Sequence, residues 1–260
     1  MPYTVLQITD CHLGIEEGGK LLGLDSDLSL QYVLTHMLSE HQRADALICS
    51  GDLVNDKAFE PYRRLIDKLP DYMPQFWLPG NHDDNHCMAS MVGENQQFLG
   101  SYTLGSWQIT LLDSSIPEEV GGSIAPSELD RAVALLEKHH DKHHLFFTHH
   151  HLKPVGCQWL DTQVINNAEQ VLQVLGQFTQ LKLVVCGHVH QDNHQRYKHI
   201  DLYTTPSTCI QFKPNSHDFA VGEEMPGYRW IELHDDGSYE TAVSRIPFRN
   251  LSIEFGSSGY

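Results

Sequence analysis

A residue that can bind a metal ion follows each of five apolar runs in this chain, and this repeated pattern constrains the fold more than any other feature. The runs are YTVLQIT, ADALICS, PQFWLPG, HLFFTH and LKLVVCGH. In α/β proteins the carboxyl ends of parallel strands line one crevice, so residues that follow different strands can meet at one point. A single Asp or His after a strand is usually a turn former, but five such positions in order predict a shared site. The residues at these positions are Asp10, His12, Asp52, Asn81, His82, Asp83, His149, His188 and His190.

The order of strand-like and helical segments predicts one α/β domain over residues 1–260. Apolar residues at helical spacing lie between the strands, and Pro126 followed by Ser127 and Asp130 predicts a helix start of the capping-box type. Residues 1–198 are expected to form an α/β part that carries every ligand. Residues 199–260 are expected to form closing antiparallel strands and a tail, with a hairpin at 235–238. The strand-like runs cover residues 3–9, 44–50, 74–80, 106–113, 144–149, 181–188 and 199–205. The helical faces consist of Leu28, Val33, Leu34, Met37 and Leu38, of Leu129, Val133 and Leu136, and of Val171, Leu172 and Leu175.

The charge and the cysteine content exclude several classes of protein. The chain has 34 acidic and 17 basic residues and a net charge of -17, so we expect it to bind neither nucleic acid nor an anionic membrane surface. The first ten residues lack the basic start of a signal peptide, and no apolar run reaches the roughly 18 residues of a membrane span. The six cysteines include no CxxC pair and are expected to be small buried residues without chemistry. These features predict a cytoplasmic protein.

The residue types at the strand ends predict a site for two metal ions. Carboxylate, imidazole and amide ligands without thiolates suit divalent Mn, Fe, Co or Zn. The set offers more ligands than one ion uses, and Asp52 is the expected bridge between two ions about 3.5–4 Å apart. Two such ions, two carboxylates and a bridging hydroxide keep about one positive charge, which suits a phosphodiester. The hydroxide would be the nucleophile, so no serine or cysteine nucleophile is required.

The ordered motifs D-x-H, GD, GNHD, a later His and GHxH resemble those of the calcineurin-like metallophosphoesterase superfamily. The resemblance implies a four-layer αββα sandwich, in which helices flank two mixed β-sheets, and a dinuclear metal centre that hydrolyses phosphate esters. His82 would be the catalytic histidine beside the leaving group, and Asp83 would either orient its imidazole or cap the loop. The resemblance implies one ion on Asp10, His12, Asp52 and His190 and the other on Asp52, Asn81, His149 and His188.

Four stretches that extend beyond the metal motifs narrow the resemblance to the bacterial class III 3',5'-cyclic AMP phosphodiesterases. They are GDLVNDKAFEPYRRL, FWLPGNHDDN, HHHLKPVGCQWLDTQVINNAEQVL and TTPSTCIQFKPNS. The resemblance implies hydrolysis of cyclic AMP to 5'-AMP, which lowers cyclic AMP in bacterial signalling, with Fe²⁺ or Mn²⁺ as the expected ions and Zn, Co or Mg as alternatives. One departure is His151-Leu152, which stands where related enzymes often have two prolines. The residues implied to contact the substrate are His12, Asp52, Asn81, His82 and His190.

Seven histidines crowd the stretch HHDKHHLFFTHHH, residues 139–151. The resemblance makes His149 the ligand and His150 its alternative or its supporting neighbour, while His151 is expected in the loop. The stretch is thus predicted to be a turn followed by one ligand, and not a metal-binding tract. The residues expected in a solvated turn after a helix are His139, His140, His143 and His144.

Two other functions are compatible with the same motifs. A broader phosphodiesterase or nuclease of the superfamily would share every metal ligand, and a non-catalytic scaffold would keep only the fold. The acidic surface argues against the nuclease, and the complete ligand set argues against the scaffold. Trp77, Trp159 and residues 84–91 are candidates for either the base pocket or the core. The sequence leaves open the native metal, the choice between cyclic AMP and cyclic GMP, and the oligomeric state.

Overall fold

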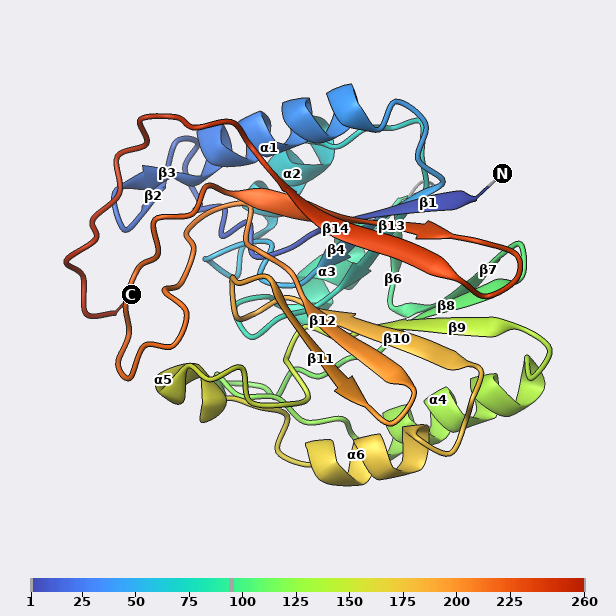
Figure 1. Cartoon of the computed structure of the whole chain (residues 1–260). Coiled ribbons are helices and arrows are strands. Elements are labelled where there is room, and N and C mark those ends of the chain that lie inside the picture. The colour runs from blue at the N-terminus through green and yellow to red at the C-terminus, as the bar shows by residue number, and fades with distance from the viewer. Residues whose placement is uncertain (1, 94–95, 260) are drawn as a thin grey trace.

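Two mixed six-stranded sheets face each other, and helices cover the outer face of each sheet (Figure 1). The computed structural model describes residues 2–93 and 96–259. Helices α1 and α2 lie on one side of the pair of sheets, and α4 and α6 lie on the other. The predicted four-layer αββα sandwich is therefore confirmed.

The first sheet has the strand order β14-β13-β1-β4-β5-β6. Strands β1, β4, β5 and β6 run parallel, and β13 runs antiparallel to β1. The predicted hairpin at 235–238 joins β13 to β14. The strands are β1 (Tyr3–Ile8), β4 (Ala46–Ser50), β5 (Gln75–Leu78), β6 (Gln96–Phe98), β13 (Gly227–Leu233) and β14 (Tyr239–Arg245). The helices on this sheet are α1 (Ser26–Glu40), α2 (Phe59–Lys68) and α3 (Asn85–Met91).

The second sheet has the strand order β11-β12-β10-β9-β8-β7. Strands β12, β10, β9 and β8 run parallel. In the part of the chain that the structure describes, no helix is both long enough and apolar enough to span a membrane. The strands are β7 (Gly100–Leu104), β8 (Trp107–Leu111), β9 (His143–Phe147), β10 (Leu181–Cys186), β11 (Asn193–Tyr197) and β12 (Ile200–Thr204). The remaining elements are α4 (Pro126–Lys138), α5 (Gln158–Asp161) and α6 (Ala168–Leu175), with the short pair β2 (Lys20–Leu21) and β3 (Leu24–Asp25).

The central strands are buried on both faces, which explains their continuous apolar runs. Successive side chains of a strand point to opposite faces. In β4, Ile48 therefore lies between the two sheets, whereas Leu47 lies under the helices. In β10, Val185 lies between the sheets and Val184 contacts the layer of α4 and α6. This packing holds the parallel strands side by side, and with them the loops that follow their carboxyl ends.

Helix starts account for two differences from the sequence predictions. Helix α1 begins at Ser26, with Asp25 accepting a hydrogen bond from the Leu28 backbone N–H at 2.9 Å. This start leaves Leu28 exposed, and Leu30 is buried in its place. Helix α4 begins at Pro126, with Ala125 as its N-cap residue instead of Ser127, and the side chain of Ala125 makes no capping bond. Pro suits this first position because its missing N–H would have no partner there.

Strand β12, the first of the expected closing strands, pairs antiparallel with β11 and parallel with β10. One further prediction is wrong in the second sheet. The expected solvated turn holds for His139 and His140, but β9 begins at His143. His144 is fully buried, and its Nε2 donates to the carbonyl of His139 at 3.0 Å. Helices α2, α3 and α5 were not predicted; α2 buries only Pro61, Tyr62 and Leu65.

Candidate metal centre

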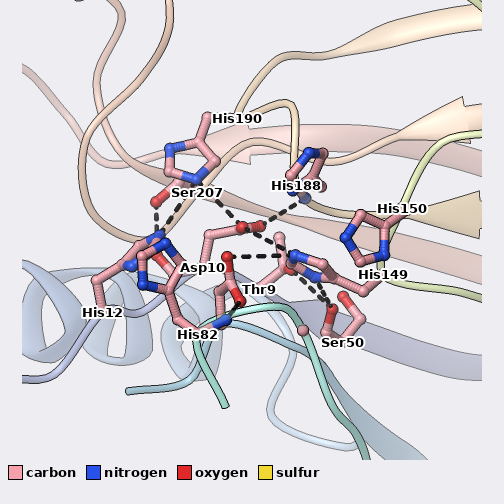
Figure 2. A network of polar contacts seen from close by, with 12 residues as sticks. Thr9, Asp10, His12, Ser50, His82, His149, His150, His188, His190 and Ser207 are labelled. Carbon is pink, nitrogen blue, oxygen red and sulfur yellow. Dashed lines mark hydrogen bonds and ion pairs between the residues drawn. The ribbon is translucent and has the colours of Figure 1, made fainter. Parts of the chain in front are cut away.

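The five strand ends with possible metal ligands meet at one place between the two sheets. Strands β1, β4 and β5 are parallel neighbours in the first sheet, and β9 and β10 are parallel neighbours in the second. Their carboxyl ends bring residues from five separate loops together, as predicted. Figure 2 shows Asp10, His12, His149, His188 and His190 converging on a common space.

The side chains in this space form overlapping groups whose ligand atoms lie within 4.8 Å of one another. Because neighbouring groups share members, they form one continuous cluster, and Asp52 belongs to two of the groups. A cluster of this extent, with a shared carboxylate, suits two divalent ions. The groups are Asp10, His12 and His190; His12, Asp52 and His82; Asp10, Asp52 and His149; and His149, His150 and His188.

The contacts of His190 suit a cation held between its ring and two neighbouring side chains. Its Nδ1 donates to the carbonyl of Ile210 at 2.6 Å, so its Nε2 carries a lone pair when the ring is neutral. This Nε2 lies 3.1 Å from Asp10 Oδ1 and 3.3 Å from His12 Nε2. Electron-rich atoms at such distances require a proton or a metal ion between them, so the donor set fits a cation.

His149 shows the same arrangement on the other side of the cluster. Its Nδ1 donates to the carbonyl of Ser50 at 2.8 Å, and its Nε2 lies 3.2 Å from Asp52 Oδ2. Burial lowers the pKa of His149, but attraction to Asp52 and Asp10 outweighs burial and raises that pKa to about 9. Asp10 Oδ1, Asn81 Oδ1 and His149 Nε2 are buried and find no hydrogen-bond partner among the described residues. These atoms are therefore available as metal ligands.

His150 is a weaker candidate ligand than His149, although it belongs to a group with His149 and His188. Its Nε2 donates to the carbonyl of Val120 at 3.1 Å, and its Nδ1 accepts from the Ser114 hydroxyl at 2.9 Å. Both ring nitrogens are therefore occupied by the protein. His151 lies in the loop, as predicted, but it is buried, and its ring is stacked with that of His188.

The backbone at the cluster is held in a sparsely populated conformation. The φ angles are 54° at Asp10, 48° at His12, 49° at Asp52, 64° at His188 and 49° at His190. Non-glycine residues rarely adopt this left-handed region, and such strain gathers at functional sites. The strands and loops thus fix the directions of five candidate ligands at a cost in backbone energy.

Two glycines permit the close approach of the loops. A Cβ atom on Gly51, where φ is 94°, would lie 2.5 Å from His149 Nδ1. A Cβ atom on Gly80 would lie 2.5 Å from the backbone nitrogen of Asp52. Both distances are shorter than any real Cβ contact, so these positions require glycine for the loops to meet.

His82 and Asp83 lie beside the cluster but differ in their contacts. The His82 backbone N–H donates to Asp52 Oδ1 at 2.8 Å, and its ring lies 5.0 Å from that of His12. The Asp83 carboxylate instead accepts from Tyr62 Oη at 2.8 Å and from backbone N–H groups of the two loops that follow β4 and β5. These contacts favour the loop-capping alternative for Asp83 over an orienting contact to the imidazole of His82.

A cleft of about 260 Å³ opens beside the cluster and is lined in part by Asp52, Asn81, His82 and His188. Its other lining residues include Trp159, Gln163, Phe212 and Phe219. Gln163 accepts a hydrogen bond from His188 Nε2 at 2.8 Å, so Nδ1 carries the lone pair of a neutral His188.

Of the two tryptophans considered for the base pocket, Trp159 lines the cleft, whereas Trp77 is fully buried in the core. Gln163 and Phe212 lie within stretches that carried the family resemblance, but no spacing in the sequence marked them.

We expect the metal-free protein to lose stability as the pH falls from about 6.5 to 4. Burial lowers the pKa of His12 and His150 to about 3 and that of His151 to about 4. An unfolded histidine has a pKa of about 6.5, so unfolding takes up protons below that pH and becomes more favourable. His149, whose pKa is raised to about 9, is protonated in both the folded and the unfolded state over this range and changes none of these protons; its contribution to stability is lost only as the pH rises from about 6.5 to 9. Thermal unfolding of metal-free protein across this range should show a falling midpoint, which the His151→Asn variant should make less steep; a midpoint independent of pH would contradict the prediction.

Comparison with known proteins agrees with the site geometry. A sequence profile of the family described as calcineurin-like phosphoesterase matches residues 3–192. A Pseudomonas aeruginosa protein named 3',5'-cyclic adenosine monophosphate phosphodiesterase CpdA is 34% identical over 98% of this chain and 94% of that protein. Proteins of the same name from Vibrio vulnificus and Escherichia coli K12 are 37% and 34% identical over the same shares.

Solved structures share the fold at low sequence identity. A dimetal phosphatase from Danio rerio superposes with a TM-score of 0.63 at 16% identity, covering 95% of this chain and 100% of the other. The purple acid phosphatase PPD1 from yellow lupin superposes with a TM-score of 0.71 at 11% identity, covering 94% of this chain and 52% of the other. The profile match over residues 3–192 and the relatives that cover 98% of the chain show that this protein belongs to the calcineurin-like phosphoesterase family.

Proposed function

We propose that this chain is a phosphodiesterase that hydrolyses 3',5'-cyclic AMP to 5'-AMP. The observation that carries the proposal is the extent of the similarity to proteins named as cyclic AMP phosphodiesterases, which reaches 98% of the chain at 34–37% identity. That extent includes the segments around Trp159 and Phe212, which line the cleft, as well as the metal motifs. A family relationship limited to the metal ligands would support phosphate ester hydrolysis without indicating the substrate.

The proposed metal ligands follow from the two ends of the cluster. One ion would be held at the end where His190 Nε2, His12 Nε2 and Asp10 Oδ1 face one another. The other would be held where His149 Nε2 faces Asp52. The sets we propose are Asp10, His12, Asp52 and His190 for one ion, and Asp52, Asn81, His149 and His188 for the other.

Hydrolysis replaces the bond between phosphorus and the 3' oxygen with a bond to an oxygen from water. Two bound divalent ions supply Lewis acidity and make hydroxide available at neutral pH. His82 lies at the edge of the cluster, half-buried and lining the cleft, and would give a proton to the departing 3' oxygen. The side chains proposed to contact the substrate are His12, Asp52, Asn81, His82 and His190.

The native ions and the location are part of the same proposal. Imidazole, carboxylate and amide ligands accept several divalent metals, and we propose Fe²⁺ or Mn²⁺, with Zn, Co or Mg as substitutes. We place the enzyme in the cytoplasm, since its six cysteines are free thiols and a reducing compartment keeps thiols free.

A substrate panel tests the proposal directly. We expect the metal-loaded protein to show its highest kcat/KM with cyclic AMP among cyclic AMP, cyclic GMP, bis-p-nitrophenyl phosphate and single-stranded DNA. The acidic chain, with a net charge of -17, should repel the polymer. Faster hydrolysis of bis-p-nitrophenyl phosphate or DNA would instead indicate a broader phosphodiesterase or a nuclease. No hydrolysis with any of the five metals would indicate a non-catalytic scaffold.

A further inference from the structure

We propose that Trp159, which Phe212 and Phe219 hold beside the metal ligands, binds the base of the nucleotide by stacking. The three side chains are called here the aromatic wall. This inference rests on the proposed function in one respect, namely that the phosphate of the ligand lies at the metal ligands. It goes beyond that function because it assigns the part of the cleft that recognises the rest of the substrate.

The aromatic wall and the metal ligands line the same cleft. The 260 Å³ cleft includes Asn81 and His188 together with all three aromatic residues. The ring of Phe212 stacks on the imidazole of His190, with centroids 4.0 Å apart and planes 11° apart. Since His190 belongs to the group around Asp10, the wall begins at the edge of the cluster. A ligand whose phosphate lies at the cluster therefore has an aromatic surface next to it.

Contacts within the protein hold the aromatic wall in place before a ligand binds. The Trp159 ring lies 4.9 Å from that of Phe212 and 5.1 Å from that of Phe219. Its indole Nε1 donates to Ser216 Oγ at 3.3 Å. A β-bridge between Phe212 and Val221 closes the loop that carries Phe219. Binding to such a preformed surface avoids the entropy cost of ordering it.

Part of the wall keeps its ring surface accessible. Phe212 is buried against His190, but Trp159 is only half-buried. A side chain that served the core alone would be expected to bury its ring, as Trp77 and Trp107 do. The exposed part of the Trp159 ring at the cleft is therefore able to contact a ligand.

The chemistry of the wall suits a nucleobase. The three side chains carry no charge, so they complement the planar base and leave the phosphate to the metal ligands. Stacking of a base on an aromatic side chain changes affinity by about 5- to 100-fold and tolerates every base, because each base has a π-face. The wall thus contributes affinity for a nucleotide and does not by itself select adenine over guanine.

The test compares two phosphates that differ only in the base. We expect metal-loaded wild-type protein to bind 5'-AMP more tightly than ribose 5-phosphate in titration calorimetry. The Trp159→Leu variant should weaken 5'-AMP binding by about 5- to 100-fold and leave ribose 5-phosphate binding unchanged. Trp159→Phe, which keeps a stacking surface, should retain most of the preference for 5'-AMP.

A matched control and a second variant keep the result interpretable. Trp230→Leu makes the same change on β13, outside the cleft, and should leave both affinities unchanged. If Trp159→Leu is misfolded by circular dichroism, Phe219→Leu removes one of the two aromatic contacts that hold Trp159 and should also weaken 5'-AMP binding more than ribose 5-phosphate binding. Equal weakening of both ligands, or no weakening of either, would overturn the inference.

Failure of this inference and failure of the proposed function give different results. If the wild-type protein hydrolyses cyclic AMP but binds 5'-AMP and ribose 5-phosphate equally, the aromatic wall is wrong and the proposed function stands. If the preference for 5'-AMP depends on Trp159 but cyclic AMP is not hydrolysed, the wall stands and the proposed function is wrong.

Discussion

We expect the Asp52→Asn variant to hold fewer than two metal ions per chain and to lose turnover of cyclic AMP by about 10⁴-fold or more, because water without a metal has a pKa of about 15.7 rather than about 7. Asn has nearly the same shape and can still accept the 2.8 Å hydrogen bond from the His82 backbone N–H. It lacks, however, the negative charge that the two ends of the cluster share. The change therefore removes the proposed bridging ligand without removing the contact to the His82 backbone.

The same substitution should also change His149. Burial lowers the pKa of this histidine, and attraction to Asp52 is the main effect that raises it to about 9. Without that carboxylate, His149 in the metal-free protein should become neutral at lower pH, which NMR of the imidazole can follow. Elemental analysis after removal of free metal gives the ion content, and Asp130→Asn, on the exposed face of α4, is the control. Two retained ions together with wild-type turnover would contradict the assignment of Asp52 as the bridge.

The convergence of the ligands could be predicted because it depends on local patterns and one rule of topology. Asp10, Asp52 and His190 each follow an apolar run within a few residues. The carboxyl ends of parallel strands meet, and both sheets place these ends together. Neither step requires knowledge of which strands are neighbours, so the convergence could be predicted without the order of the strands.

Contacts between distant segments could not be predicted in the same way. The sequence could not exclude His150 from its residues alone, because the decision depends on Ser114 and Val120, which are 36 and 30 residues away. The burial of His144 likewise depends on where β9 begins, and a run of histidines gives no apolar pattern that marks a strand. Gln163 reaches His188 from a different loop, and only the fold brings the two together.

The strained backbone explains why the short GD and GNHD motifs were enough to predict where the candidate ligands lie. Left-handed φ angles at Asp10, Asp52 and His188 cost energy that the surrounding structure must offset. Gly51 and Gly80 remove the clashes that a side chain would cause where the loops meet. The GD and GNHD motifs therefore combine a ligand with the glycine that allows it to approach the cluster.

We expect the His82→Ala variant to keep both metal ions and to lose about 10²- to 10⁴-fold in kcat with cyclic AMP. The contact of this residue to Asp52 comes from the backbone N–H, at 2.8 Å, and alanine retains it. The imidazole is half-buried at the cleft and belongs to a group with His12 and Asp52. Its removal should therefore affect the chemical step more than the metal content.

Two substrates with different leaving groups can distinguish proton donation by His82 from any other role of this residue. A ribose 3' oxygen is a strong base and needs a proton as it departs, whereas p-nitrophenolate departs readily without one. The His82→Ala loss should therefore be much smaller with bis-p-nitrophenyl phosphate than with cyclic AMP. His86→Ala, an exposed histidine on the adjacent helix α3, is the matched control and should leave both rates unchanged. Equal losses with the two substrates would mean that His82 positions the phosphate or a metal ligand, because only a proton donor distinguishes a poor leaving group from a good one.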